Sequence, residues 1–411
     1  MSKSALPATV EKIVRYNAGR DPDRLALKYK AIADNAFSFL RGTCPLYFEQ
    51  LPKHAILSDA PVAWICGDLH LENFGSYKGD NRLVYFDLND FDEALLAPCS
   101  WEILRTLTSI VIAAPAMNVK RDAAIEMARQ CLATYGATLA SGKARWIDRD
   151  AADGLIGQLF EQLQTRKRAD FIASRTTAES NHTKIRTDKG KALPASEHDK
   201  ERVSAWIKAY AAGKEDPGFF KVVDVARRIA GTGSLGLERF AILVEGKGGG
   251  DGRYLLDLKE SIPSALAPYT PVKQPKWHSE SERVATVGSR MEAVPPAFLE
   301  AVDLGGKPFL LKGLQPTQDR VGLAGAAAHP KQLNHLMCQF GGLAASAQLR
   351  ASGRQGSANA DALVEFGSDV KKLDALVDLG VQMADLVEKD WQTFAEEYKK
   401  DAAGLLALSA K

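Results

Sequence analysis

The sequence predicts an α+β fold, with strands gathered in two places and helices at both ends of the chain. Short apolar runs bounded by Gly, Asp and Asn occur at 62–65 and 83–86, and a second set lies between 222 and 314. Apolar residues recur at helical spacing in 8–41, 101–165 and 331–411. Strand-like runs set between helical stretches are typical of an α+β chain.

Length and composition indicate an ordinary globular protein of one or two domains. The chain has 411 residues and a formal net charge of +2, so overall charge favours neither a nucleic-acid nor a membrane partner. Its five cysteines are widely spaced, without a C-x-x-C pair, which favours a reducing compartment over disulfides or a zinc site. No signal peptide or membrane-length apolar run is found, so we expect a cytoplasmic protein.

The first elements are helices. Apolar spacing predicts one helix in 8–19 and a longer one in 22–41, which begins at Pro22 and ends beside Gly42. The strands 62–65 and 83–86 are then expected to pair across the turn at 79–81.

The segment 66–93, CGDLHLENFGSYKGDNRLVYFDLNDFDE, is rich in carboxylate and amide side chains. The two expected strands would deliver Asp68 and Asn73 from one end and Asp87 from the other. A carboxylate can orient an alcohol and accept its proton, and amide and carboxylate oxygens are ligands for Mg²⁺. Any one of these residues could serve only a turn or a cap, but the three together favour a catalytic site.

GDLHLEN at 67–73 resembles the D-x-x-x-x-N catalytic loop of protein kinases, in the form of the aminoglycoside and choline phosphotransferases. With FLRGT at 39–43 and FDLNDFDEA at 86–94, it also resembles an uncharacterised bacterial family of kinase-like proteins. The resemblance implies Asp68 as the base and Asn73 and Asp87 as Mg²⁺ ligands, with Asp90 or Asp92 available for a second metal.

After this segment, 101–114, 119–140 and 151–165 read as helices, the first nearly all apolar. The segment 164–200 is polar, basic and poor in apolar residues, which predicts a loop or linker. Its cations could contact phosphates or simply form a solvated face; they are Arg166, Lys167, Arg168, Lys184, Arg186, Lys189 and Lys191.

A second motif lies between the expected strands 222–229 and 239–245, where Gly231, Gly233 and Gly236 follow a G-x-G-x-x-G pattern. A dinucleotide-binding turn should open a helix, whereas an apolar strand follows here. A glycine loop between two antiparallel strands is the kinase arrangement, in which backbone N–H groups approach phosphates. Lys259, at the end of the strand 254–259, resembles the kinase lysine that contacts those phosphates.

The next expected elements complete a five-stranded sheet. A helix in 278–292, capped by Ser279, would supply the acid that pairs with Lys259, and both Glu282 and Glu292 qualify. Strands at 298–304 and 307–314 follow, and the segment 315–316 would be the hinge that meets adenine. The tail 331–411 reads as helices.

In kinases the glycine loop precedes the catalytic loop, but here it follows, so either one of the two motif sets is accidental or the fold is circularly permuted. The accidental reading leaves no nucleotide lobe, because only 67 residues precede Asp68 and they look helical. We therefore expect a circularly permuted, two-lobed kinase-like fold: a catalytic part in 1–200, a nucleotide part in 201–320 and a helical tail in 321–411 that returns to the first. Catalysis requires the spatial arrangement of the groups and not their order in the chain.

The expected function is ATP- and Mg²⁺-dependent phosphoryl transfer to a hydroxyl group, and the aminoglycoside-type loop implies a small-molecule acceptor. Three alternatives stay open. The same site could transfer AMP, the protein could be a nucleotide-binding pseudokinase that regulates a partner, or the glycines could belong to an NAD-linked dehydrogenase. The sequence identifies neither the acceptor nor the oligomeric state.

Overall fold

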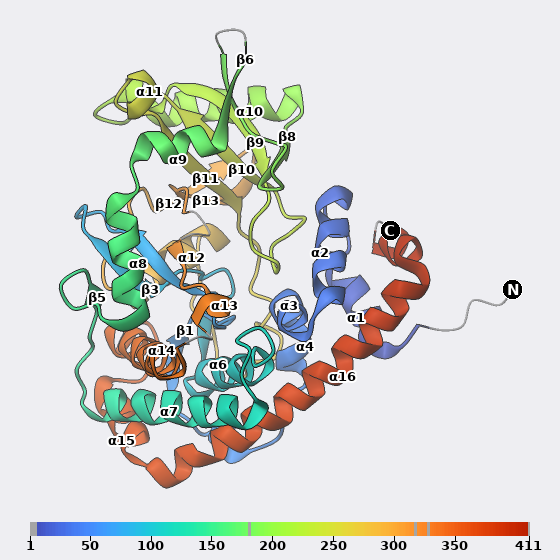
Figure 1. The fold of residues 1–411 in the computed structure, drawn as a ribbon, viewed down its shortest axis with the longest axis vertical. Coiled ribbons are helices and arrows are strands. Elements are labelled where there is room, and N and C mark those ends of the chain that lie inside the picture. The colour runs from blue at the N-terminus through green and yellow to red at the C-terminus, as the bar shows by residue number, and fades with distance from the viewer. Residues whose placement is uncertain (1–5, 180–181, 316–318, 327–328, 410–411) are drawn as a thin grey trace, which may run out of the picture.

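A computed structural model describes residues 6–179, 182–315, 319–326 and 329–409 (Figure 1). An antiparallel sheet lies at the top of the view, and most helices lie below it. The strands that carry the segment 66–93 lie between these two regions. The expected α+β class is confirmed. Within the described residues, no helix is both long and apolar enough to cross a membrane.

The upper sheet has six strands in the order β12-β13-β11-β10-β9-β8. They are β8 (Ala192–Pro194), β9 (Val222–Arg228), β10 (Arg239–Val244), β11 (Tyr254–Glu260), β12 (Glu300–Leu304) and β13 (Lys307–Gly313). Five strands were expected at nearly these positions. The sixth, β8, pairs with the end of β9, and its three residues are too few to produce a recognisable apolar run.

Alternation along the strands gives this sheet two different faces. Ile242 and Leu256 lie in a cluster with helix α10 (Glu197–Ala211), whereas Asp257 and Lys259 belong to the opposite face. Helix α12 (Glu280–Met291) joins β11 to β12 and begins as predicted, because the Ser279 hydroxyl accepts a hydrogen bond from the backbone of the third following residue. Two short turns, η1 (Pro217–Phe220) and α11 (Gly249–Gly252), complete this region.

The central strands pair differently from the prediction. Strand β1 (Val62–Ile65) pairs with β4 (Leu95–Pro98), while β2 (Phe74–Lys78) pairs with β3 (Val84–Leu88) and β5 (Ile147–Asp148) extends that hairpin. The predicted pairing of 62–65 with 83–86 is therefore wrong. The missing strand, FGSYK, contains Gly and Lys and has no apolar run that the sequence could reveal.

The lower region is built from helices of both ends of the chain. It contains α1 (Ala8–Tyr16), α2 (Pro22–Asp34), α3 (Ala36–Gly42), α4 (Cys44–Glu49), α5 (Ala55–Ser58), α6 (Ser100–Ile112), α7 (Arg121–Ala140), α13 (Leu323–Ala326), α14 (Pro330–Ala351), α15 (Ala360–Ser368) and α16 (Val370–Ser409). The single helix predicted over 22–41 is wrong, because Asn35 is extended and its side chain caps α3. Helix α16 packs along α6, α2 and α1, so the tail returns to the first helices.

The segment 164–200 is more ordered than predicted. It contains the end of α8 (Gly154–Thr165), then α9 (Arg168–Arg175), β6 (Thr176–Glu179) and β7 (His182–Ile185). Its few apolar residues gather on one side, where Ile172 and Ile185 are buried in a cluster with Leu243 and Leu255 of the upper sheet. Burial of these two side chains explains why a polar sequence folds here.

Candidate functional site

A glycine turns the chain from β1 toward a cavity. Gly67 has φ +86°, and a Cβ atom there would lie 2.4 Å from the Glu93 carbonyl oxygen, so other residues would be strained and obstructed. Asp68 follows immediately and lines the cavity, whose volume is about 50 Å³. The buried strand therefore ends in a carboxylate that faces open space.

Arg105 of helix α6 holds Asp68. Its Nε donates to Asp68 Oδ1 at 2.7 Å, its Nη2 bonds the same oxygen, and Nη2 also donates to the Leu40 carbonyl at 2.8 Å. Burial raises the pKa of Asp68 while Arg105 opposes that rise. Arg105 was not among the residues predicted from the sequence, although a lone cation in a nearly apolar helix was the signal that could have revealed it.

Asn73 closes the loop that begins at Asp68. Its Nδ2 donates to the Asp68 carbonyl at 2.8 Å, and its own carbonyl accepts from the Asn89 N–H at 3.1 Å. The amide oxygen of Asn73 has no hydrogen-bond donor among the described residues. Asn73 is 5% exposed and lines the same cavity as Asp68. The structure thus brings these two predicted residues together.

Lys259 is paired with acids of the segment 66–93. Its Nζ bonds Asp92 and lies 3.7 Å from Asp90 Oδ1. Burial opposes ionisation of Asp90, but Lys259 and Lys312 outweigh it and lower the pKa of Asp90. Lys259 and Asp90 are therefore neighbours, as the predicted site requires.

Neither glutamate that was considered for Lys259 pairs with it. Glu282 accepts a hydrogen bond from the His278 N–H at 2.6 Å, at the start of α12. Glu292 is 5% exposed and lies near Lys312 at the other end of that helix. The partner of Lys259 comes instead from the chain directly after β3, which local spacing around Lys259 could not indicate.

The structure does not bring Asp87 to the cavity. Asp87 is fully buried within β3, where its Oδ2 accepts hydrogen bonds from the Ala293 N–H at 3.1 Å and from Arg350 at 2.6 Å. Its other oxygen accepts from the Leu88 N–H. These bonds occupy both carboxylate oxygens, whereas Asp90, Asp92 and Glu93, which follow β3, line the cavity.

The glycine-rich turn between β9 and β10 lies over Asp68. A Cβ atom on Gly233 would lie 3.8 Å from Asp68 Oδ2, and Gly231 and Gly233 line the cavity with Asp68. Gly236 has φ +95° and packs against Arg20, where a Cβ atom would come within 2.6 Å of the Arg20 side chain. Only glycine permits this close approach.

Two basic residues that the sequence analysis missed hold this turn. Arg20 Nη1 donates to the Gly233 and Leu235 carbonyls at 2.7 and 2.8 Å. Lys28 Nζ donates to the Gly233 carbonyl at 2.8 Å, although Lys28 is fully buried and burial lowers its pKa well below the usual range. Lys28 belongs to α2 and Arg20 to the junction before it, and both lie more than 200 residues before the turn.

A larger cavity, of about 260 Å³, adjoins the first one and shares Asp90 and Gly231 with it. Its lining includes seven basic and four acidic side chains: Arg41, Lys191, Arg228, Arg239, Lys259, Lys312, Arg320, Glu72, Asp90, Asp257 and Asp319. Arg228 and Arg239 both pair with buried Asp257 and lower its pKa. The excess of cations suits a polyanion.

The predicted hinge borders this larger cavity. Gln315 donates from Nε2 to the Ser76 carbonyl at 2.5 Å, and its own carbonyl accepts from Arg228 at 2.8 Å. Pro316, the other predicted hinge residue, lies outside the described residues.

A family model described as "Uncharacterized protein conserved in bacteria (DUF2252)" matches residues 20–397. No curated protein and no solved structure matches the chain. The matched range contains every residue of the two cavities described above except Tyr16.

Proposed function

The chain belongs to the DUF2252 family of proteins conserved in bacteria, and we propose that it is an ATP- and Mg²⁺-dependent phosphotransferase acting on a hydroxyl group of a small molecule. One arrangement supports the proposal above all. Asp68, fixed by Arg105 and bonded through its carbonyl to Asn73, faces a glycine-rich turn at the edge of a cation-rich cavity. A positioned base beside a phosphate-sized, positively charged space is what phosphoryl transfer requires.

We propose further that the fold is a circularly permuted relative of the kinase fold. Supporting this, a glycine turn joins the first two strands of the long antiparallel run, Lys259 lies on the third, and α12 follows it. Asp68 and Asn73, in the loop between β1 and β2, line the cavity together with this glycine turn.

In this proposal Asp68 accepts the proton of the acceptor hydroxyl. The hydroxyl oxygen forms a bond to the γ-phosphorus, the bond between that phosphorus and the bridging oxygen breaks, and ADP leaves. Lys259 would bind the α- and β-phosphates, and N–H groups around Gly231 and Gly233 would cover them. Burial raises the pKa of Asp68. This carboxylate is therefore a better proton acceptor than an exposed one, whose pKa lies further below the working pH.

The residues present also fit Mg²⁺. The amide oxygen of Asn73 and the carboxylate of Asp90 are hard oxygen ligands that line the same cavity, and both were expected as metal ligands, whereas Asp87 does not line it. Among the described residues, no group of three or more His, Cys, Asp or Glu side chains is arranged as a metal site. Phosphate oxygens and water would supply the other ligands, and the metal would neutralise charge on the phosphates.

A small acceptor is supported by the size of the cavity at Asp68. Its volume of about 50 Å³ lies beneath the glycine-rich turn and between Tyr16 and Arg41. A folded protein surface could not reach Asp68 through this space, whereas a hydroxyl group on a small molecule could.

The first test is the thermal stability of the purified protein with ATP, ADP and NAD⁺, each with and without Mg²⁺. We expect ATP to raise the melting temperature only with Mg²⁺, and Lys259→Ala and Asp90→Asn to remove the effect. The variant Lys189→Ala, in an exposed part of the chain, is the control. No shift with millimolar ATP would refute the proposal.

The bond that is cleaved separates the two transferase hypotheses. With ATP labelled at both the α- and γ-phosphorus, phosphoryl transfer leaves ADP and moves the γ-label. Transfer of AMP releases pyrophosphate and moves the α-label to the acceptor. Stabilisation by ATP without either product would instead indicate a nucleotide-binding pseudoenzyme.

A further inference from the structure

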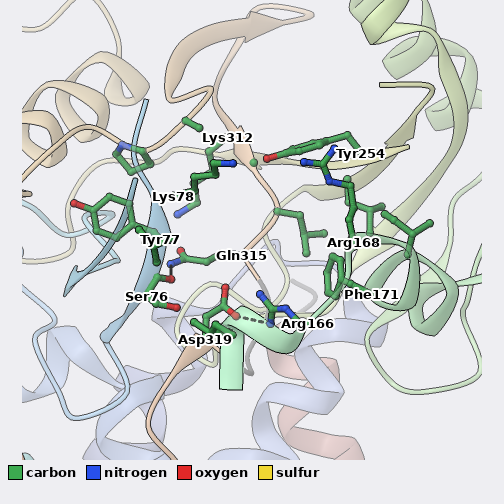
Figure 2. Close-up of a pocket in the computed structure, with 18 of the residues that line it drawn as sticks. Ser76, Tyr77, Lys78, Arg166, Arg168, Phe171, Tyr254, Lys312, Gln315 and Asp319 are labelled. Atoms are coloured by element: carbon green, nitrogen blue, oxygen red, sulfur yellow. Dashed lines mark hydrogen bonds and ion pairs between the residues drawn. The ribbon is translucent and has the colours of Figure 1, made fainter. Parts of the chain in front are cut away.

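A third cavity, of about 360 Å³, is lined by residues of helices α8 and α9, of strands β2, β11 and β13, and of the chain directly after β13 (Figure 2). One wall contains Leu163 and Phe171 of the α8–α9 connection. Another contains Lys312 of β13 and Gln315, which follows that strand, and Lys78 of β2 completes it. The cavity shares no lining residue with the one that contains Asp68.

The lining combines apolar, aromatic and basic side chains. Phe171 and Tyr254 lie on the same side of the cavity in Figure 2, and Leu255 and Leu314 add apolar surface. The volume falls within the usual range for small-molecule sites, about 300–1,000 Å³. Flat apolar groups are bound best by such surfaces.

The charge of this lining is strongly one-sided. Six of its side chains are basic and one is acidic: Lys78, Arg166, Lys167, Arg168, Arg253, Lys312 and Asp319. The one acid is already paired, because Arg166 Nη1 donates to Asp319 at 2.7 Å. Within the described part of the chain, Lys78, Lys167, Arg168 and Lys312 form no ion pair with a carboxylate.

These cations also lie close enough to disfavour one another. Burial lowers the pKa of Lys78, and Arg168 lowers it further. The guanidinium of Arg168 lies over the Tyr254 ring at 5.4 Å from its centre, so the charge is placed beside an aromatic wall. A bound anion would relieve this repulsion at Lys78, whose pKa is lowered by burial and by neighbouring cations.

We propose that this cavity is a second ligand site, separate from the site of Asp68, for a small molecule that carries a phosphate group on a flat, partly apolar ring. Lys78 and Arg168 bind the phosphate, and Tyr254 and Phe171 contact the ring. A bound ligand would therefore contact helices α8 and α9 as well as strands β2, β11 and β13. Lys312 and Gln315 also line the cavity of about 260 Å³ that contains Lys259, so the two sites share a wall.

The probe for this proposal is 1-naphthyl phosphate, whose fluorescence reports binding to the full-length protein. We expect saturable binding, weakened about tenfold or more by Arg168→Ala and by Lys78→Ala, since each removes a charge-assisted contact. Lys189→Ala, an exposed cation in the same basic segment that lines none of these cavities, is the matched control and should bind as the wild type does.

Two further measurements separate this site from the proposed nucleotide site. Lys259→Ala should leave binding of the probe unchanged. Increasing concentrations of Mg²⁺–ADP should change the apparent affinity for the probe only up to a constant value. If Mg²⁺–ADP competes fully with the probe, or if Lys259→Ala abolishes binding of the probe, then the probe occupies the cavity of about 260 Å³ that contains Lys259, and the proposal is wrong. Absence of saturable binding, or equal binding by the Arg168→Ala variant, would also overturn it. None of these outcomes depends on whether the protein turns over ATP.

Discussion

At the scale of single residues, the ion pair between Asp68 and Arg105 is the feature that most distinguishes this site. Two nitrogens of Arg105 bond one carboxylate oxygen, and the same guanidinium also donates to the Leu40 carbonyl. The other oxygen of Asp68 is left toward the cavity and the glycine-rich turn. The pair therefore orients the carboxylate and keeps one oxygen available.

If Asp68 is the base, Asp68→Asn should lower the rate at which ADP is formed from Mg²⁺–ATP at least about a hundredfold, because a positioned base typically contributes that much or more. Affinity for Mg²⁺–ADP should not change. The control is Asp80→Asn, in the exposed turn between β2 and β3. A wild-type rate in Asp68→Asn would contradict the assigned role.

Arg105→Lys tests the positioning role of Arg105. Lysine keeps the charge but loses the paired donors, so the pKa of Asp68 should rise, because Arg105 opposes the increase caused by burial. The active, ionised form of Asp68 would then be lost at a higher pH. The acidic limb of the rate profile should move upward in pH while nucleotide affinity stays constant. An unshifted limb with a merely lower rate would indicate a structural role only.

Glu102 makes stability depend on pH. It is fully buried in α6, and burial raises its pKa to about 7 from a usual value of 4.5. The folded protein therefore binds a proton that the unfolded chain has lost, and stability falls as pH rises through this interval. We expect the free energy of unfolding to decrease by about 3 kcal/mol for this group between pH 4.5 and 8.

Chemical denaturation across this pH range checks the effect. Glu102→Gln should reduce the slope of the free energy of unfolding against pH without removing it, because burial also raises the pKa of Glu93 to about 7. Glu365→Gln, at an exposed position of α15, should retain the wild-type slope. Stability that rises with pH in the wild type would show that Glu102 is not the controlling group.

At the scale of elements, the glycine-rich turn is held by helix α2 and the junction before it, in addition to Arg239 of its own strand β10. Arg20 and Lys28 bind carbonyl oxygens of the turn and place Gly233 above Asp68. These bonds keep the turn close to Asp68, so we expect them to slow nucleotide binding beneath it.

Lys28→Met should loosen this turn without unfolding the protein. Methionine fills a similar volume, and the Gly233 carbonyl keeps its hydrogen bond from Arg20, so no buried group loses its last partner. We expect faster amide hydrogen exchange in 230–237 and faster association of Mg²⁺–ATP. Lys30→Met, on the exposed side of the same helix, should do neither. Unchanged exchange in Lys28→Met would show that the lysine does not restrain the turn.

At the scale of the whole molecule, contacts between distant segments determine how the two ends of the chain come together. The Tyr29 hydroxyl and the Ser409 hydroxyl are 2.6 Å apart, and Thr9 donates to Asp390 at 2.9 Å. Asp87 and Arg350 join β3 to helix α14 across 263 positions of sequence. The tail is thus part of the support for the strands that carry the site.

Loss of one partner of the Asp87–Arg350 pair should be costly. Arg350→Met leaves Asp87 buried without its counter-charge, and we expect a loss of about 3–5 kcal/mol in the free energy of unfolding. The double variant Asp87→Asn, Arg350→Met should recover part of that loss. Arg354→Met, at an exposed position, is the control. Equal melting temperatures for Arg350→Met and Arg354→Met would contradict this role.

Local sequence determined most of the elements and part of the site. The Ser279 cap placed α12, and apolar alternation located five strands of the upper sheet, because these signals act over a few residues. The five-residue spacing from Asp68 to Asn73 allows one loop to bond the two residues directly. Their joint place at the cavity was therefore predictable.

Only the tertiary structure decided which acids reach the cavity. Asp87 and Asp90 are three residues apart, yet one is buried against Arg350 and the other lies beside Lys259. Arg20, Lys28 and Arg105 were missed for the same reason, since each meets its partner only after distant segments pack. Hydrogen bonds and burial between residues far apart in the chain depend on the packed arrangement, and a local pattern contains no information about it.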